Sequence, residues 1–270
     1  MTSGSRVNGD GFSGALPTSA TATSNVGSYG ITQGTLGVSA NYAVTYVGAN
    51  LTVDPRAVTV TANAVSRAYG DANPALTFAT TSLGAGAALS GSLATAADAT
   101  SNVGTYAVGQ GTVTTASNPN YKVTYVGADL TVTQRAVTVT ANAASRDYGD
   151  ANPALTYGLT SGSLANGDSL SGALATSATT IANVGTYGIT QGSLAASSNY
   201  ALTFVGANLT VAQRAITITA NDLSRLAGQA NPPLTYGIGG RGLANGDSLT
   251  GELATTATAA SGPGSYAVTQ

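Results

Sequence analysis

Arg56-Ala-Val-Thr-Val-Thr-Ala-Asn63 is the stretch of sequence that decides the fold, because it recurs twice at a fixed spacing. It returns as residues 135–142 and, with Ile in place of Val, as residues 214–221, so the step is 79 residues. In each copy an apolar residue alternates with Thr, which is typical of a strand with one buried face. The chain is therefore expected to be a tandem array of β repeats.

This step predicts four segments along the chain. Residues 56–134 and 135–213 are complete repeats, residues 1–55 are the C-terminal part of a repeat, and residues 214–270 are the N-terminal part of one. A unit of this length is too long for a helical solenoid repeat and suits a small sandwich of two sheets. Because each partial segment lacks strands that the other contains, we expect the two to associate between chains.

The pattern of the repeat 135–213 predicts six strands separated by turns. Turns are expected at residues 148–153 and at Asn166-Gly167-Asp168, where Gly, Asn, Asp and Pro cluster. In the fourth strand Tyr187 and Ile189 are expected to point inward. The predicted strands are residues 136–141, 154–158, 170–176, 185–190, 200–205 and 207–211.

The apolar alternation changes phase between the last two predicted strands. Tyr200 and Phe204 lie in one phase, and Leu209 and Val211 lie in the other. A chain that crosses from one sheet to the second at Gly206 explains the change, and we expect Gly206 to supply the conformational freedom for the bend.

The junctions between repeats are short. Only about three residues, as at 133–135, separate the last predicted strand of one repeat from the first strand of the next. A flexible linker is longer and richer in Gly and Ser. We therefore expect neighbouring repeats to stack end to end with restricted bending, in an elongated array.

Composition excludes several classes of function. Charged residues make up 7% of the chain and the net charge is −2, so there is no basic face for nucleic acid. No apolar run approaches the roughly 18 residues that span a membrane. The chain has no His and no Cys, hence no imidazole base, thiolate nucleophile or disulfide. We expect no enzyme, no catalytic, cofactor-binding or metal-ligating residues, and no cofactor.

Acidic residues in the loops are the candidates for calcium ligands, because hard cations bind carboxylate oxygens. There is no dense run of alternating acids, and turn residues that tolerate positive φ are the favoured interpretation. Arg67 stands four residues before Asp71, as Arg146 does before Asp150, and a surface ion pair is predicted for each. The loop acids concerned are Asp71, Asp150, Asp168 and Asp247.

Tyrosine is the commonest aromatic residue, with 13 Tyr against 3 Phe. Four of these tyrosines directly follow Gly-Ser or Gly-Thr, namely Tyr29, Tyr106, Tyr187 and Tyr266. They could form an exposed surface that stacks on sugars or on a partner protein. They could instead be core rings whose hydroxyl groups bind backbone at a strand corner. Their phase, shared with Val108 and Ile189, favours the core.

The combined pattern Arg-Ala-Val-Thr-Val-Thr-Ala-Asn, Ser-Arg-x-Tyr-Gly-Asp and Asn-Pro-x-Leu-Thr resembles the MBG-type immunoglobulin-like repeats of bacterial adhesins. The triplets Tyr69-Gly70-Asp71 and Tyr148-Gly149-Asp150 resemble the YGX variety of these repeats. The resemblance covers essentially the whole chain and implies tandem immunoglobulin-like β-sandwiches. Such repeats occur in large filamentous-haemagglutinin-like proteins exported across the outer membrane, so it also implies an extracellular or cell-surface location and no catalytic residues.

Two segments depart from this pattern. The last one has Ala227-Gly228-Gln229 in place of Tyr-Gly-Asp, and the repeat 56–134 has Gly84-Ala85-Gly86 where the others have Asn-Gly-Asp. We expect a structural spacer or stalk whose partners are the neighbouring repeats of the same chain. The alternative is a module that binds a host glycan or protein directly, with the divergent loop 81–88 as its binding surface.

Overall fold

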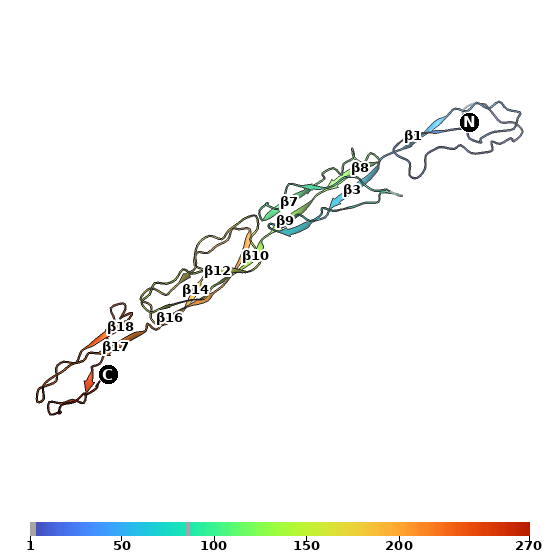
Figure 1. Ribbon diagram of the computed structural model, residues 1–270. Helices are drawn as coiled ribbons and strands as arrows, with labels where there is room; N and C mark the ends of the chain where they lie inside the picture. Colours follow the sequence, from blue (N-terminus) through green and yellow to red (C-terminus); the bar gives the residue numbers. More distant parts are fainter. Residues whose placement is uncertain (1–3, 85–86) are drawn as a thin grey trace. The chain divides into compact units, whose positions relative to one another are not determined.

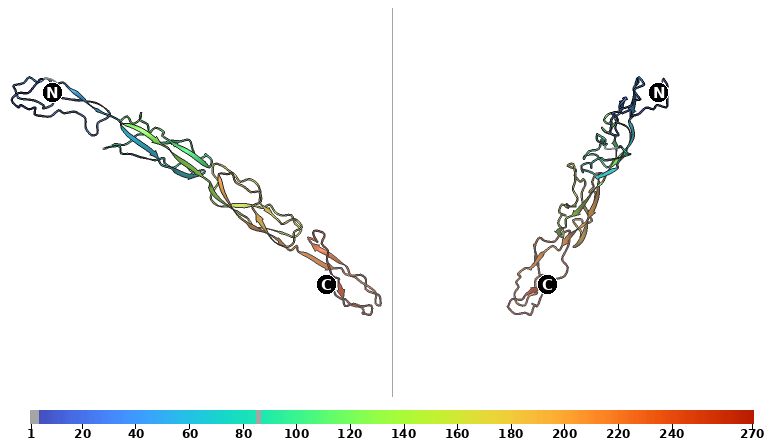
Figure 2. Two further views of the ribbon diagram at one scale, coloured as in Figure 1. Left: turned by 180° about the vertical axis from the view of Figure 1, so that it is seen from behind. Right: turned by 90° about the vertical axis from the view of Figure 1, so that its right-hand side faces the viewer.

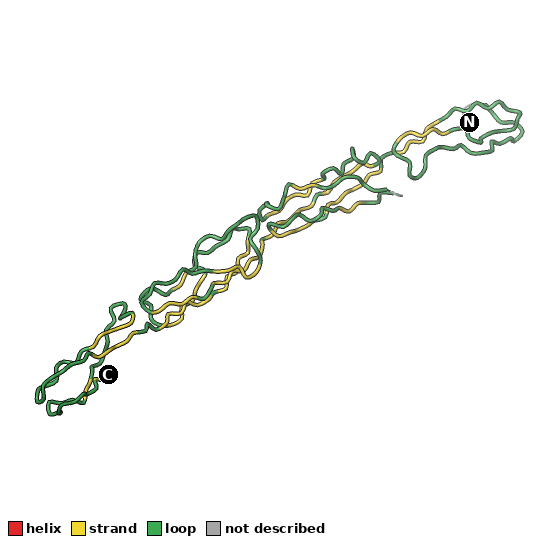
Figure 3. The backbone as a smooth tube through the Cα atoms, viewed as in Figure 1, coloured by secondary structure: helices red, strands yellow, loops and turns green. Residues whose placement is uncertain are grey.

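The computed structural model describes residues 4–84 and 87–270. The regular secondary structure of these residues consists of β-strands, with no helix (Figure 3). The chain divides into two units, Met1–Arg135 and Ala136–Gln270, which are considered separately. Each unit holds one repeat with two sheets and one with fewer strands (Figures 1 and 2). The prediction of an all-β protein made of tandem repeats is confirmed.

The second repeat, in the first unit, consists of two sheets. The first sheet has the order β5 (Phe78–Thr80), β3 (Arg56–Ala62), β8 (Tyr121–Val126). The second has the order β4 (Val65–Ala68), β9 (Ala128–Thr133), β7 (Gly104–Gly109), β6 (Ala94–Thr95). The pairs β3–β8 and β4–β9 are parallel, and the other pairs are antiparallel.

The third repeat has the same strand order. One sheet is β12 (Tyr157–Ser161), β10 (Arg135–Ala141), β15 (Tyr200–Val205), and the other is β11 (Ala144–Asp147), β16 (Ala207–Ala212), β14 (Gly185–Thr190), β13 (Ala175–Thr176). The predicted strands 185–190 and 200–205 are confirmed, and 136–141 and 207–211 are confirmed to within one residue.

Two of the predicted strands are misplaced, and one strand was not predicted. The predicted strand 154–158 begins only at Tyr157, which pairs with Ala141 at the end of β10. Of the predicted strand 170–176 only β13 forms. The short strand β11 has no apolar alternation, because its one buried side chain is Arg146.

The change of phase at Gly206 marks the passage of the chain between sheets, as predicted. β15 belongs to the three-stranded sheet and β16 to the four-stranded sheet. Gly206 does not have a positive φ, so a left-handed backbone is not what requires the glycine. A Cβ atom there would lie 2.9 Å from the carbonyl oxygen of Ile189, so close approach of β14 requires the glycine.

Replacing Gly206 by Ala is expected to lower the free energy of unfolding of the third repeat by about 1–2 kcal/mol, because the added methyl group meets backbone. Gly127 occupies the same position in the second repeat, but its nearest such contact is 3.6 Å from the carbonyl oxygen of Val108. Gly127→Ala is the control and should leave stability unchanged. Thermal unfolding with peptide-resolved hydrogen exchange distinguishes the repeats, and equal losses in both would contradict the explanation.

Each complete repeat has its own apolar core between its sheets. The residues that alternate with Thr in β3 and β10 point into these cores, as the sequence predicted. The side chains that are at most 2% exposed are Val58, Val60, Val108, Val113, Leu130 and Val132 in the second repeat, and Val137, Val139, Ile189, Leu194, Leu209 and Val211 in the third.

The first and fourth repeats hold fewer strands. In the first, β1 (Gly27–Ile31) pairs with β2 (Ala49–Val53). In the fourth, β17 (Ile216–Ala220) pairs with β18 (Tyr236–Gly240), and β19 (Ala254–Thr255) pairs with β20 (Val268–Thr269). No described residue of 4–55 or 214–270 is fully buried.

The same sequence motif is a strand in one repeat and irregular in another. Residues 42–47 correspond to β8 and β15, and residues 223–226 correspond to β4 and β11, yet neither segment is a strand. β8 pairs with β3, and β4 pairs with β9. The described parts of the first and fourth repeats hold no counterpart of β3 and β9, respectively. Strand formation at these sites therefore depends on the pairing partner and not on local propensity.

Candidate functional site

The ion pairs predicted between Arg67 and Asp71 and between Arg146 and Asp150 are wrong. Arg146 is only 7% exposed, because the inner face of β11 carries it into the repeat. Its Nε donates to Oδ1 of Asn152 at 2.7 Å, and its Nη1 donates to the carbonyl of Asp147 at 3.1 Å. Arg67 binds its own Asn73 and neighbouring carbonyls in the same way.

This buried arginine joins three parts of the repeat. Nη2 of Arg146 donates to the carbonyl of Thr179, and Nδ2 of Asn152 donates to the carbonyl of Ala178 at 2.6 Å. The Ser-Arg and Asn-Pro motifs are thus a structural clamp that holds the turn after β13 against β11. The charge of the guanidinium is stabilised by carbonyl dipoles and an amide oxygen.

The aspartates of the Tyr-Gly-Asp triplets bind the first residue of the following repeat. Nη1 and Nη2 of Arg135 each donate to Oδ1 of Asp71 at 3.1 Å. Nη1 of Arg214 donates to Oδ1 of Asp150 at 3.2 Å. The partners are 64 residues apart in both cases, and sequence reasoning that considered only local spacing missed the pairing. The only signal in the sequence is that both residue types recur with the repeat.

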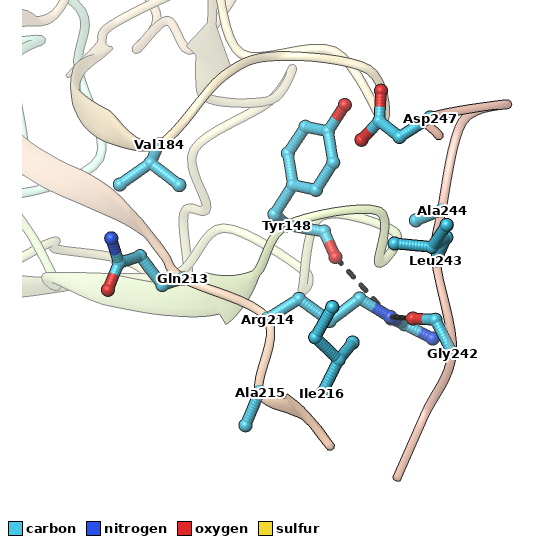
Figure 4. A pocket seen from close by; sticks show the side chains of 10 residues that line it. All are labelled: Tyr148, Val184, Gln213, Arg214, Ala215, Ile216, Gly242, Leu243, Ala244 and Asp247. Carbon is cyan, nitrogen blue, oxygen red and sulfur yellow. Dashed lines mark hydrogen bonds between the residues drawn. The ribbon is translucent and has the colours of Figure 1, made fainter. Parts of the chain in front are cut away.

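In the second unit, Arg214 is the centre of the contact between the third and fourth repeats (Figure 4). Its Nη1 donates to the carbonyl of Tyr148 at 3.4 Å and its Nε to the carbonyl of Gly242 at 2.8 Å. Gly149 has φ +81°, and a Cβ there would lie 2.3 Å from the Cβ of Ala244. Glycine in the triplet therefore allows both the turn and the close approach of the next repeat.

A second arginine strengthens this contact. Arg241 stands where the third repeat has Gly162. Its Nη1 donates to Oδ2 of Asp147 at 3.0 Å and to Oδ2 of Asp150 at 2.9 Å, and its Nη2 donates to Oδ1 of Asp150. The hydrogen bond from Arg241, together with the positive charges of Arg241 and Arg214, lowers the pKa of the Asp150 carboxyl.

The contact through Asp150 is expected to weaken only in strong acid. A carboxyl whose pKa is lower in the folded contact contributes stability above its ordinary pKa of about 3.9, and this contribution is lost as the pH falls through the lowered value. Carboxyl titration by NMR should show Asp150 titrating below that ordinary value, and Arg241→Gln should return it toward that value. Asp98, whose pKa is lowered by Thr100, is the control and should not respond to Arg241→Gln.

In the first unit, the side-chain amide of Asn120 connects the second repeat to the first. Nδ2 of Asn120 donates to Oδ1 of Asn25 at 2.8 Å, and Oδ1 of Asn120 accepts from the backbone N–H of Val26 at 2.8 Å. The carbonyl of Asn120 also accepts from the N–H of Arg56, the first residue of β3. Within each unit, neighbouring repeats are thus joined by hydrogen bonds between side chains and backbone groups.

The Asn-Gly-Asp triplets are turns, as favoured from the sequence. Asn8, Asn166 and Asn245 have φ of 57°, 54° and 54°. Oδ2 of Asp168 accepts a hydrogen bond from the hydroxyl of Tyr200 at 2.8 Å. Among the described residues no group of three or more acidic, His or Cys side chains could hold a metal ion. In the divergent loop 81–88, residues 85 and 86, and so most of the triplet 84–86, lie outside the described residues.

The tyrosines after Gly-Ser and Gly-Thr are corner residues, as the favoured interpretation predicted. Their hydroxyl groups donate to the carbonyl four residues earlier, at 2.7 Å for Tyr29, 2.9 Å for Tyr106, 2.8 Å for Tyr187 and 3.1 Å for Tyr266. The ring of Tyr187 packs on the core formed by Ala141, Ile189 and Leu209, whereas Tyr266 in the fourth repeat is 41% exposed. Each hydroxyl group is thereby used within its own repeat.

The repeats match one known domain family. The family model described as MBG domain (YGX type) matches residues 1–52, 58–131, 137–210 and 216–270. Comparison with curated proteins and with solved structures gave no match. In the part of the chain that the structure describes, no helix is long and apolar enough to cross a membrane.

Proposed function

Because the chain belongs to the family of YGX-type MBG domains, we propose that it is a non-enzymatic structural spacer, the stalk of a bacterial cell-surface or secreted adhesin. In this proposal the segments 1–55, 56–134, 135–213 and 214–270 are successive modules outside the cell. The observation that carries the proposal is the repeated pairing of the triplet aspartate with the first arginine of the next module, Asp71 with Arg135 and Asp150 with Arg214.

The lengths of the connections support a spacer. Within the first unit, β2 ends at Val53 and β3 begins at Arg56. Between β16 and β17 lie residues 213–215. Connections of two or three residues within a unit leave little room for bending, in contrast to a flexible linker. A stalk needs this property, because a freely jointed chain cannot hold an adhesive tip away from the cell.

The distribution of exposed aromatic residues also supports a spacer over the alternative, direct binding of a host glycan or protein. Among the described residues, the exposed aromatic side chains are Phe12, Tyr157, Tyr236 and Tyr266, which are spread over the first, third and fourth repeats. A binding surface is expected to concentrate such residues in one module. Glycan-array binding by residues 56–134, and by no other repeat, would support the alternative.

A distance measurement between repeats tests the spacer. The chain has no Cys, so Ser169→Cys and Ser248→Cys place one label at equivalent exposed sites of the third and fourth repeats. Double electron–electron resonance should give one narrow distance distribution, which Asp150→Asn broadens because both arginine contacts weaken. Asp98→Asn is the control, since the Asp98 carboxylate accepts its hydrogen bonds from Thr100 and Ser101 in its own turn. A broad distribution in the unaltered chain would contradict the proposal.

A further inference from the structure

We propose that the third repeat binds a second copy of the chain through the free edge of β15, so that the three-stranded sheets of two copies join along antiparallel β15 strands. β15 is an outer strand of its sheet, next to β10. Such an edge presents backbone N–H and C=O groups that can pair with another strand. β15 and its counterpart β8 in the second repeat differ in how this edge is protected.

Two features protect the edge of β8. The N–H of Val123 donates to Oγ1 of Thr115 at 3.0 Å, so a group that could pair with an incoming strand is already bound. The exposed Lys122 places a charge on the same strand, and lysine on an edge strand is a common protection against pairing. Lys122 is the one lysine of the sequence.

β15 lacks both features. Ala201 stands where β8 has Lys122, so β15 carries no charge. The connection from the preceding Gln-Gly turn to the strand is two residues shorter than in the second repeat. Counted from that turn, Ala196 takes the place of Thr115, and its side chain has no hydrogen-bond acceptor. The backbone edge of β15 is therefore open where that of β8 is closed.

The other edge strands of the third repeat are protected. β12 contains Gly158, and its register with β10 shifts between Thr138 and Val139. β13 has two residues, and β11 has four and ends with the charged Asp147. Irregular pairing, short strands and charges are the means by which sheet edges avoid other strands. β15, with six residues and no charge, is thus the edge that remains suited to a partner.

A second β15 fits this edge, because the strand is complementary to itself. By correspondence with β8, the N–H groups of Leu202 and Phe204 point to the free edge, whereas that of Tyr200 is bound to the carbonyl of Ser197. Antiparallel pairing about a two-fold axis then sets Leu202 of one copy opposite Phe204 of the other. Both side chains are half-buried, and pairing covers them further. At the axis Thr203 meets Thr203 of the second copy, a favourable cross-strand pair.

Antiparallel pairing makes the two chains run in opposite directions at the contact. The functional consequence rests on the proposed function, in which the chain is a stalk. Stalks anchored in one cell surface run in the same direction, whereas stalks on two facing surfaces run in opposite directions. Pairing through β15 therefore joins stalks of facing cells, and the third repeat recognises its own kind rather than a foreign ligand.

Sedimentation of the full chain with charge variants tests the association. Thr203 is exposed, so it can be replaced without loss of the core. Thr203→Lys and Thr203→Glu should each weaken self-association at least about tenfold, because like charges then face each other. An equimolar mixture of the two variants should associate again. Thr124→Lys, at the same position of β8, is the matched control and should change nothing. A strict monomer of the unaltered chain, or no recovery on mixing, would overturn the proposal.

Oxidation of single-cysteine variants tests the register, since the chain has no Cys of its own. Thr203→Cys should give a disulfide-linked dimer, because residues directly opposite in an antiparallel pair are within disulfide reach. Thr124→Cys is the control and should remain monomeric. Equal dimer yields from the two positions would overturn the assignment of the contact to β15.

Beads that carry the full chain attached by one end test the contact between facing surfaces. The beads should cluster with one another, and Thr203→Lys on all beads should prevent the clustering. Association in solution without clustering would contradict the role between facing cells. These outcomes leave the spacer function untouched, because the distance measurement tests the spacer within a single chain.

Discussion

Replacing Arg146 by Met is expected to lower the free energy of unfolding of the third repeat by about 2–3 kcal/mol. Methionine fills similar space in the buried position but leaves Oδ1 of Asn152 and the carbonyl of Thr179, which are partly buried, without their donor. Each unsatisfied buried acceptor costs about 1–3 kcal/mol. Urea unfolding followed by peptide-resolved hydrogen exchange should show the loss in residues 136–213 and not in residues 56–134.

The fourth repeat supplies the matched control. Arg225 makes the same contacts, to Asn231, Leu226 and Thr258, but there the hydrogen bonds are exposed to solvent. Water can replace the lost donors, so Arg225→Met should cost less than about 1 kcal/mol. If both substitutions had the same small effect, the buried clamp would not be a source of stability.

Leu209→Ala is expected to destabilise the third repeat by about 3–4 kcal/mol. Leu209 is 0% exposed, and truncation leaves a cavity among Ala141, Ala178 and Ile189 that these small or β-branched side chains cannot fill. Leucine-to-alanine changes in such sites cost about 2–5 kcal/mol. The measurement is again the change in protection of β14 and β16 amides, with the second repeat as an internal reference.

Leu51→Ala is the control for this change in the same sequence motif. Leu51 is 42% exposed in the first repeat, so its truncation should cost less than about 1 kcal/mol in dilute solution. The comparison isolates burial, because the flanking residues Asn-Leu-Thr-Val are the same at both sites. A large loss of stability on Leu51→Ala would mean that Leu51 packs into a core of the first repeat, although 42% of its surface is exposed.

The strands predicted most accurately from the sequence are those in which apolar residues alternate regularly with small or polar ones. The strands at 185–190 and 200–205 were predicted at their observed bounds, because Tyr187 and Ile189 or Tyr200 and Phe204 alternate with small or polar residues. The crossing at Gly206 followed from the change of phase. The short strand β11 was missed because its inward-facing residue is Arg146. A pattern based on apolar residues predicts that an arginine is exposed, and so it shows no alternation there.

The candidate site was predictable in its residue types but not in its partners. The sequence singled out Asp71 and Asp150, and assigned each to an arginine four residues away. A separation of four residues brings side chains together on a helix, whereas here Arg146 lies in a strand and Asp150 in the turn beyond it. The true partners, Arg135 and Arg214, are 64 residues distant and become neighbours only where one repeat meets the next.

The parallel pairing of β3 with β8 has a mechanical consequence. β3 opens the second repeat, while β8 runs directly into β9, which closes it. A force that pulls the two ends of the repeat apart therefore slides β3 along β8 and loads the whole ladder in shear, from Arg56 opposite Tyr121 to Thr61 opposite Val126. All of these hydrogen bonds must yield together, in contrast to a hairpin that opens one bond at a time. The rate of forced unfolding, which sets how long a tether holds under load, should be correspondingly slow.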